Sequence, residues 1–391
     1  MKFRTIRMLS TALAAFCAVL ITHVPSAFGQ EDIRGKNLIF WVKPLVGANQ
    51  AKIAEESAAG TGLKMWRYSV TSTRRGPDKG KKFTGVMVGN SPLSTNGTTT
   101  TIVDVVPLVI HIEGKTFSPL AADKSCLGGR VPLSVLAQSP MVQNHDFTLD
   151  GVNVGNTQYP DAFQRANFWK SVVAHGGTYH NKLSYRMLPA ISITPGIHSA
   201  LFSVTGGGCR LTYGGIEINW FDNLIRTKII PSLRSRGVHP ANLPLFMLYN
   251  TTMYSSNTNN CCVGGYHGAF GSPVQTYSPF QFDSVGVFGA GSKDTAIMAH
   301  EVNEWQDDPL GTNPTPPWGK VGQVTGCQNN LEVGDPLSGT DVRNVTMNGH
   351  TYHLQELAFF SWFFGPPSIG TGGKFSDNGT FKSTQGPCNG H

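Results

Sequence analysis

One histidine and two glutamates lie close together in the segment His300-Glu301-Val302-Asn303-Glu304. On a helix, a spacing of four residues places His300 and Glu304 one turn apart on the same face. An imidazole and a carboxylate in that arrangement can bind one cation, while Glu301 projects about 100° away around the helix axis. The segment therefore predicts a cation site formed by His300 and Glu304, with Glu301 beside it.

The segment resembles the HExxH motif of the zincin metallopeptidases, in which both histidines bind zinc and the glutamate is the general base. The likeness extends over residues 218–309, where it implies a backing helix, strands that include an edge strand, and the motif helix. It implies that His300 is the first zinc ligand and that Glu301 accepts a proton from a water whose pKa the metal lowers. Glu304 occupies the position of the second histidine. A carboxylate can bind Zn²⁺, but its charge also suits Ca²⁺ or Mn²⁺.

The chain after the motif carries a second likeness. The stretches HEVNEWQDDP, PPWG and EVGDP together are similar to a pattern in uncharacterised secreted bacterial proteins. This likeness implies that Glu332 or Asp335 returns to the helix as a third ligand. The alternative is an ordinary turn, in which Asp335 accepts hydrogen bonds from its own backbone before Pro336.

Three further residues are candidates with simpler explanations. Asp308 lies eight residues after His300, but Pro309 indicates that it ends the helix instead. His353 follows a hairpin predicted at Asn348-Gly349 and is explained equally by a core or surface position. His267 is expected on the edge strand, where an ordinary strand residue is the simpler interpretation.

Periodic apolar residues predict the elements that position these side chains. Residues 218–236 repeat apolar side chains every four positions and predict an amphipathic helix kinked at Pro231. The next predicted elements are strands at 243–254, 264–270 and 274–288, and a helix that begins after Ser292 or Asp294 and ends near Trp305.

The first half of the chain has a weaker pattern. Residues 30–100 predict an irregular or strand-poor region, and residues 102–117 predict a strand broken at Pro107. We therefore expect an α+β fold, zincin-like, in which a mixed sheet packs on a backing helix and an active-site helix. A β-rich or irregular N-terminal region, 30–215, precedes the metal-site domain, 216–391.

An export signal is predicted at residues 1–29. Basic residues come first, an apolar run follows over residues 9–21, and Ala27-Phe28-Gly29 provides small residues for cleavage before Gln30. The apolar run is too short to span a bilayer, and no later stretch is long enough, so no membrane span is expected. The mature chain would keep six cysteines, which predicts disulfides in a secreted or periplasmic protein. Adjacent Cys261 and Cys262 are expected to have separate partners.

Charge and motifs narrow the function. Loss of the three basic residues of the signal lowers the formal net charge from +7 to +4, too little to predict a nucleic-acid partner. The combined prediction is a secreted metal-dependent hydrolase, resembling a zinc metallopeptidase, that acts on a peptide or protein substrate. The alternative is a non-catalytic secreted binding or surface protein with a structural metal site or none.

Overall fold

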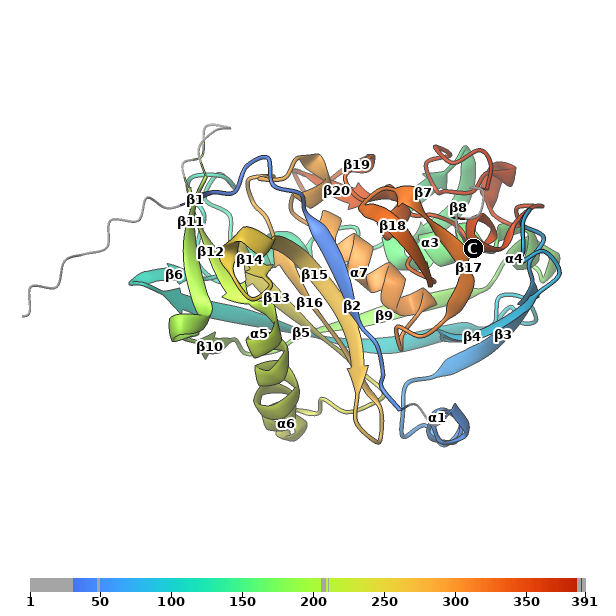
Figure 1. The fold of residues 1–391 in the computed structure, drawn as a ribbon, viewed down its shortest axis with the longest axis horizontal. Helices are drawn as coiled ribbons and strands as arrows, with labels where there is room; N and C mark the ends of the chain where they lie inside the picture. Colours follow the sequence, from blue (N-terminus) through green and yellow to red (C-terminus); the bar gives the residue numbers. More distant parts are fainter. Residues whose placement is uncertain (1–30, 48–49, 205–208, 210, 385–387, 389–391) are drawn as a thin grey trace, which may run out of the picture. The chain divides into compact units, whose positions relative to one another are not determined.

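A curled mixed sheet runs through the protein, and strands from both halves of the chain contribute to it (Figure 1). The computed structural model describes residues 31–47, 50–204, 209, 211–384 and 388, so the predicted signal peptide lies outside the described residues. Within them the sheet has twelve strands. Nine follow one another in the order β1 (Glu31–Asp32), β11 (Ser199–Val204), β12 (Leu211–Glu217), β14 (Thr251–Tyr254), β15 (Cys261–Phe270), β16 (Gln275–Phe282), β13 (Leu243–Tyr249), β5 (Thr98–Ile112) and β10 (Ile191–Ile193).

The remaining sheet strands pair beside this path, and hairpins extend from it. Strand β2 (Ile39–Lys43) pairs with β15, while β6 (Lys115–Phe117) and β9 (His180–Met187) pair with β5. The hairpins are β3 (Met65–Thr71) with β4 (Lys82–Val88), β7 (His145–Leu149) with β8 (Val152–Thr157), β17 (Pro314–Val321) with β18 (Val324–Asn330), and β19 (Val342–Met347) with β20 (His350–Gln355). The last hairpin turns at Asn348-Gly349, which confirms that prediction.

Helices cover both faces of the sheet. They are α1 (Gln50–Ala58), α2 (Pro132–Ala137), α3 (Tyr159–Asn167), α4 (Trp169–Ala174), α5 (Ile218–Leu224), α6 (Ile230–Leu233), α7 (Ala296–Asp307) and α8 (Phe360–Phe364). Every one of them is too short or too polar to cross a lipid bilayer, within the part of the chain that the structure describes.

Strand β13 shows how the two faces are divided. Its side chains alternate, so Leu245 and Met247 pack in the same apolar cluster as α7 residues such as Val302. Phe246 and Leu248 point the other way and pack with Phe221, Ile225 and Leu233 of the α5–α6 segment. The mixed sheet, with α7 on one face and the α5–α6 segment on the other, agrees with the expected α+β class.

The predicted backing helix forms with one irregularity. Residues 218–236 are helical throughout, but a π-helical turn, Ile225–Ile229, separates α5 from α6. Pro231 stands at the start of α6, where its missing N–H disturbs the preceding turn. Gly237 ends the helix with φ 83°.

Three strand predictions need correction. The strand predicted at 274–288 ends at Phe282, as β16. The segment 243–254 divides at Asn250, whose φ is 43°, into β13 and β14, which have different neighbours. Strand β5 is not broken at Pro107. Its pairing with β9 ends at Val105 and its pairing with β10 begins at Leu108, so on that side of β5 Pro107 lies between two successive partners, while β13 pairs along the other side.

The N-terminal region is more regular than its sequence indicates. Residues 31–100 contain β2, α1, β3, β4 and the start of β5, so the expectation of a strand-poor segment is wrong. Several of these strands are partly exposed and lack a continuous apolar pattern. The boundary predicted near residue 215 lies inside β12.

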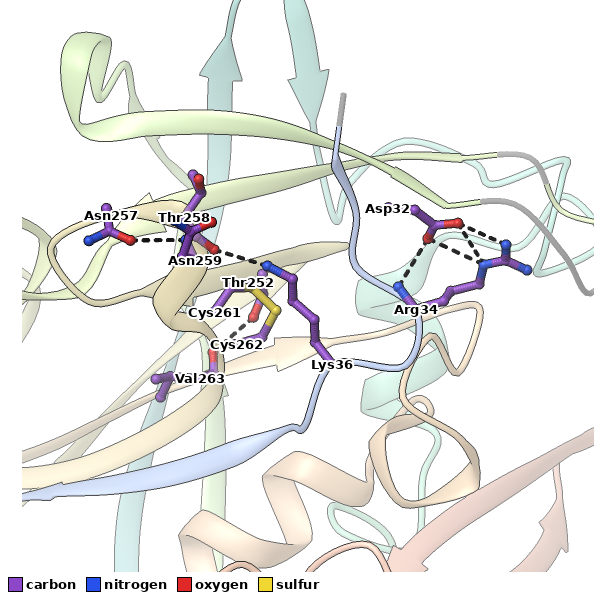
Figure 2. The surroundings of a disulfide bond; sticks show 10 residues. All are labelled: Asp32, Arg34, Lys36, Thr252, Asn257, Thr258, Asn259, Cys261, Cys262 and Val263. Atoms are coloured by element: carbon purple, nitrogen blue, oxygen red, sulfur yellow. Dashed lines mark hydrogen bonds and ion pairs between the residues drawn. A yellow bond between two sulfur atoms is a disulfide. The ribbon is translucent and has the colours of Figure 1, made fainter. Parts of the chain in front are cut away.

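The cysteines pair differently from the prediction. Cys261 and Cys262 form a disulfide with each other (Figure 2), and Cys327 pairs with Cys388. The peptide bond between Cys261 and Cys262 is cis, and their Cα atoms lie 3.0 Å apart. Figure 2 also shows Lys36, whose Nζ donates to the carbonyl of Thr258 at 3.2 Å. The segment before β2 is therefore attached beside this disulfide.

Candidate metal centre

Helix α7 carries the HExxE residues into the protein interior. All twelve of its residues are buried, and His300, Glu301 and Glu304 are at most 1% exposed. Buried ionisable groups are strongly unfavourable unless other groups or ions compensate for lost hydration. The surroundings of these three side chains therefore decide what the centre can do.

The structure brings His300, Glu304 and Asp335 together, and we call them the first ligand set. His300 Nε2 lies 3.0 Å from Glu304 Oε2 and 3.5 Å from Asp335 Oδ1. Asp335 comes from the single turn η6 (Asp335–Leu337), after β18. One ligand atom from each residue lies within 4.8 Å of the others, which is a spacing that can hold a metal ion.

Glycine lets the η6 loop approach α7. A Cβ on Gly334 would clash with the imidazole of His300. The backbone N–H groups of Gly334 and Asp335 both donate to Glu304 Oε1, at 3.0 and 3.2 Å. These bonds orient the carboxylate so that Oε2 faces His300.

Gln355 of β20 orients the His300 ring. Its Oε1 lies 3.1 Å from His300 Nδ1, and its Nε2 donates to the Gly334 carbonyl at 2.7 Å. Because Gln355 Oε1 can only accept, Nδ1 carries a proton, so a neutral, metal-binding ring would present the lone pair of Nε2 to Glu304 and Asp335. Such an outer partner is typical of a metal-binding histidine.

A second group of residues meets at the same carboxylate oxygen of Glu304. His267 Nδ1 lies 3.6 Å from Glu301 Oε2 and 3.8 Å from Glu304 Oε2. We call His267, Glu301 and Glu304 the second ligand set, whose ligand atoms also lie within 4.8 Å of one another. His267 Nε2 contacts the Asp308 carbonyl at 3.1 Å, and because a carbonyl only accepts, this bond leaves Nδ1 unprotonated.

Glu332, Asp308 and His353 lie outside both sets. Glu332 Oε1 accepts from Asn330 Nδ2 at 2.7 Å, while its Oε2 lies 3.9 Å from His267 Nε2. The Asp308 carboxylate accepts from two backbone N–H groups of the following turn, at Thr312 and Asn313, so it ends the helix. His353 pairs with Asp294 at 2.6 Å.

Several buried polar atoms of the centre have no hydrogen-bond partner among the described residues. They are His267 Nδ1, His300 Nε2, both carboxylate oxygens of Glu301, and Glu332 Oε2. Buried polar atoms in native proteins are nearly always hydrogen-bonded, and an absent ion is one explanation of an exception. These atoms are nitrogen and carboxylate oxygen, the ligand types that divalent metals use. The residues present therefore fit a divalent cation.

The electrostatics support the same interpretation. Burial raises the pKa of Glu301 and Glu332 well above the usual range, and raises that of Glu304 as well. Burial lowers the pKa of His267 to about 3, so its ring is neutral. Burial alone would also lower the pKa of His300, but the carboxylates around it, Glu304 first, raise it well above 6.5. A divalent cation would favour the ionised carboxylates and neutral imidazoles.

The expected edge strand is not an edge. Strand β15 pairs antiparallel with β14 and β16, and β2 lies parallel beside it, with Val42 opposite His267. β2 takes this position beyond the end of β14, whose pairing with β15 covers only Cys261–Val263. Strand β2 therefore occupies the edge of β15 at which a substrate strand was expected to pair.

A cavity of about 250 Å³ reaches the centre from the side of β2. Its lining includes Phe40, Trp41 and Val42 of β2 together with Glu304, Gln323, Gln328, Asn330, Glu332 and Asp335. Gln323 and Gln328 both donate to the Asp335 carboxylate and so hold it in position.

Sequence reasoning missed Gln355 and did not select His267 as a ligand. The signal for His267 was the glycines around it. Gly265 lies two residues earlier on β15, and a Cβ there would stand 2.7 Å from Glu301 Cγ. Small residues beside a strand histidine thus mark the close approach of α7.

Comparisons with known proteins add no assignment. The chain matches no protein-family model, and no curated protein or solved structure is significantly similar to it. The zincin likeness therefore depends on the motif and on the local geometry around His300 and Glu304.

Proposed function

We propose that this protein is a secreted, zincin-like metal-dependent hydrolase that acts on peptide bonds. The first ligand set would hold the catalytic cation. The observation that carries the proposal is the convergence of His300 Nε2, Glu304 Oε2 and Asp335 Oδ1 in a buried space beside a cavity.

When bound, a divalent cation supplies Lewis acidity and lowers the pKa of water. The protein's own contribution is orientation and proton transfer. Gln355 holds the His300 tautomer, and Gln323 and Gln328 hold Asp335. Glu301 is the proposed general base, because it lies beside this set and both of its oxygens are free to accept a proton.

One imidazole and two carboxylates do not select a single metal. Zn²⁺ accepts this mixture of ligands. The excess of oxygen also suits Mn²⁺ or Ca²⁺. We take Zn²⁺ as the first ion to test and the other two as alternatives.

The cavity indicates what can reach the centre. A volume of about 250 Å³ is below the 300–1,000 Å³ that is usual for small-molecule sites. It suits a side chain or a short segment of a peptide. The side-chain amides of Gln323, Gln328 and Asn330 in its lining can form hydrogen bonds with a peptide backbone.

The export part of the proposal rests on residues 1–29 and on the disulfides. N-terminal sequencing of protein collected from outside the cytoplasm tests it. A mature chain that begins at Gln30 supports export by this signal, and a retained Met1 contradicts it.

The variant Glu301→Gln tests the catalytic role. Metal content and cleavage of a peptide library, read by mass spectrometry, should be compared with Glu356→Gln, which alters a buried glutamate outside the centre. We expect Glu301→Gln to keep the cation of the first ligand set and to lose turnover by about 10²–10⁴-fold, and Glu356→Gln to keep both metal and turnover. A wild-type protein without metal, or unchanged turnover in Glu301→Gln, contradicts the proposal.

The second candidate function is a non-catalytic secreted protein stabilised by a structural cation. It is favoured by the burial of the ligands, since His267, His300 and Glu301 are fully buried and β2 covers them. In that case Glu301→Gln leaves every functional measurement unchanged, and wild-type protein cleaves no peptide.

A further inference from the structure

We propose that the centre binds two divalent cations that share Glu304, with the second cation held by His267, Glu301 and Glu304. This inference rests on the proposed function, because it assigns a second ion to the same metal centre. It uses residues that the HExxE motif alone does not bring together.

The position of Glu304 Oε2 is the first argument. This oxygen lies 3.0 Å from His300 Nε2 and 3.8 Å from His267 Nδ1, so it takes part in both ligand sets. Two ligands with metal bonds of about 2.0–2.2 Å stand roughly 2.8–3.6 Å apart at octahedral or tetrahedral angles. The spacings of 3.0 and 3.5 Å in the first set match this range. Those of 3.6 and 3.8 Å in the second set are slightly wider and suit a larger ion such as Mn²⁺.

The unpartnered atoms of the second set are an independent argument. His267 Nδ1 and both oxygens of Glu301 are fully buried and, in the part of the chain that the structure describes, have no hydrogen-bond partner. The bond from His267 Nε2 to the Asp308 carbonyl turns Nδ1, with its lone pair, toward Glu301. A cation bound by the first set alone leaves His267 Nδ1 and Glu301 Oε2 without the partner that a second cation would supply.

Charge balance is the third argument. We call Glu301, Glu304, Glu332 and Asp335 the carboxylate cluster, and all four side chains are at most 6% exposed. Within the described residues, the ion pairs of the cluster are all with His267 and His300. Four carboxylates balance the charge of two divalent cations, whereas a single cation would leave the charge of two carboxylates to be balanced in another way. An uncompensated double charge in a dry interior is strongly unfavourable.

A shared Glu304 fits a known use of paired ions. Two cations about 3.5–4 Å apart can stabilise the attacking and the leaving oxygen of a hydrolysis together. Glu301 would bind the second ion through Oε2, which faces His267, and Oε1 would stay free to accept a proton. The proposed base and the proposed ligand are thus compatible in one side chain.

Metal stoichiometry and spin coupling test the inference. The whole purified protein is stripped with chelator, equilibrated with Mn²⁺ and measured by plasma mass spectrometry and electron paramagnetic resonance. We expect about two Mn²⁺ per chain and an exchange-coupled spectrum. His267→Ala should bind about half as much and give the spectrum of isolated Mn²⁺. His353→Ala is the control, because His353 pairs with Asp294 outside the cluster, and it should behave as wild type.

The outcomes distinguish failure of the second cation site from failure of the proposed function. One Mn²⁺ per chain with an uncoupled spectrum overturns the second site and leaves the proposed function standing. No bound metal overturns both. If His267→Ala does not fold, the stoichiometry and coupling of the wild-type protein decide the question by themselves.

Discussion

Phe40 stacks on His300, with ring centroids 3.6 Å apart and an angle of 16° between the planes. The contact joins β2, near the start of the described chain, to the centre of α7. Gln323 connects Phe40 to Asp335. Its side chain accepts from the Phe40 N–H, donates to the Phe40 carbonyl and also donates to the Asp335 carboxylate. The N-terminal strand is therefore part of the support of the first ligand set.

Replacing Phe40 by alanine should weaken both folding and metal binding. Phe40 is 5% exposed, so its truncation is expected to cost about 3 kcal/mol of unfolding free energy. Loss of the stacked ring also frees His300 and should weaken cation affinity by about tenfold. Phe117→Ala is the control: Phe117 is 6% exposed in another apolar cluster. Denaturant unfolding and metal titration measure the two effects, and equal metal affinity in both variants contradicts the role given to Phe40.

Replacing Gly334 by alanine should displace the His300 ring, although alanine can adopt the backbone conformation of Gly334. Gly334 has φ −86°, which any residue adopts, but its Cβ would clash with the His300 ring. We expect cation affinity to fall by about 10- to 100-fold. Gly326→Ala, on β18, meets nothing within 4 Å and should bind metal as wild type does. Calorimetric titration compares the two, and a normal affinity in Gly334→Ala would show that the loop moves freely away from α7.

Gln355 offers a test of histidine orientation. In Gln355→Met the acceptor for His300 Nδ1 is lost, so the ring is free to adopt the other tautomer. We expect metal affinity to fall by about 10- to 100-fold. Gln355→Glu retains acceptor oxygens for Nδ1 and should keep more of the affinity, although it loses the donor to the Gly334 carbonyl. Equal losses in both variants would argue against orientation as the cause.

Removing the metal should lower thermal stability. A ligand that binds only the folded state stabilises it by about 2.7 kcal/mol at a free concentration of 100 times Kd. EDTA should therefore lower the Tm by several degrees, and added divalent metal should restore it. His300→Ala should show little response to EDTA. If wild type and His300→Ala respond equally, the stabilising ion binds elsewhere.

Asp377 should make stability depend on pH. Burial raises its pKa from 3.8 to about 7, so between these values the unfolded chain has released a proton that the folded chain still holds. Stability contributed by this group is therefore lost as pH rises from about 4 to about 7, by up to roughly 4 kcal/mol. Asp377→Asn removes this titration. Its unfolding free energy relative to wild type should rise across that interval, and a constant difference would contradict the assignment.

Local geometry made part of the centre predictable from sequence. The spacing of His300 and Glu304 fixes their relation on a helix, because the α-helical repeat is set by the backbone. The order of helix, strands and helix over residues 218–307 also follows from apolar periodicity. The loop at Glu332 and Asp335 was expected to return to the helix, although Asp335, and not Glu332, joins the first ligand set.

Contacts between distant segments were decided only by the tertiary structure. His267, Gln355 and Phe40 reach α7 because β15, β20 and β2 pack against it or against one another in a particular register. Register and loop return depend on many weak contacts summed over the whole core, and no short segment encodes them. The sequence by itself thus determined a helix with one imidazole and one carboxylate able to share a cation. The fold alone placed a second imidazole, that of His267, and the carboxylates of Glu332 and Asp335 beside that helix, because only packing at long range brings those side chains within reach.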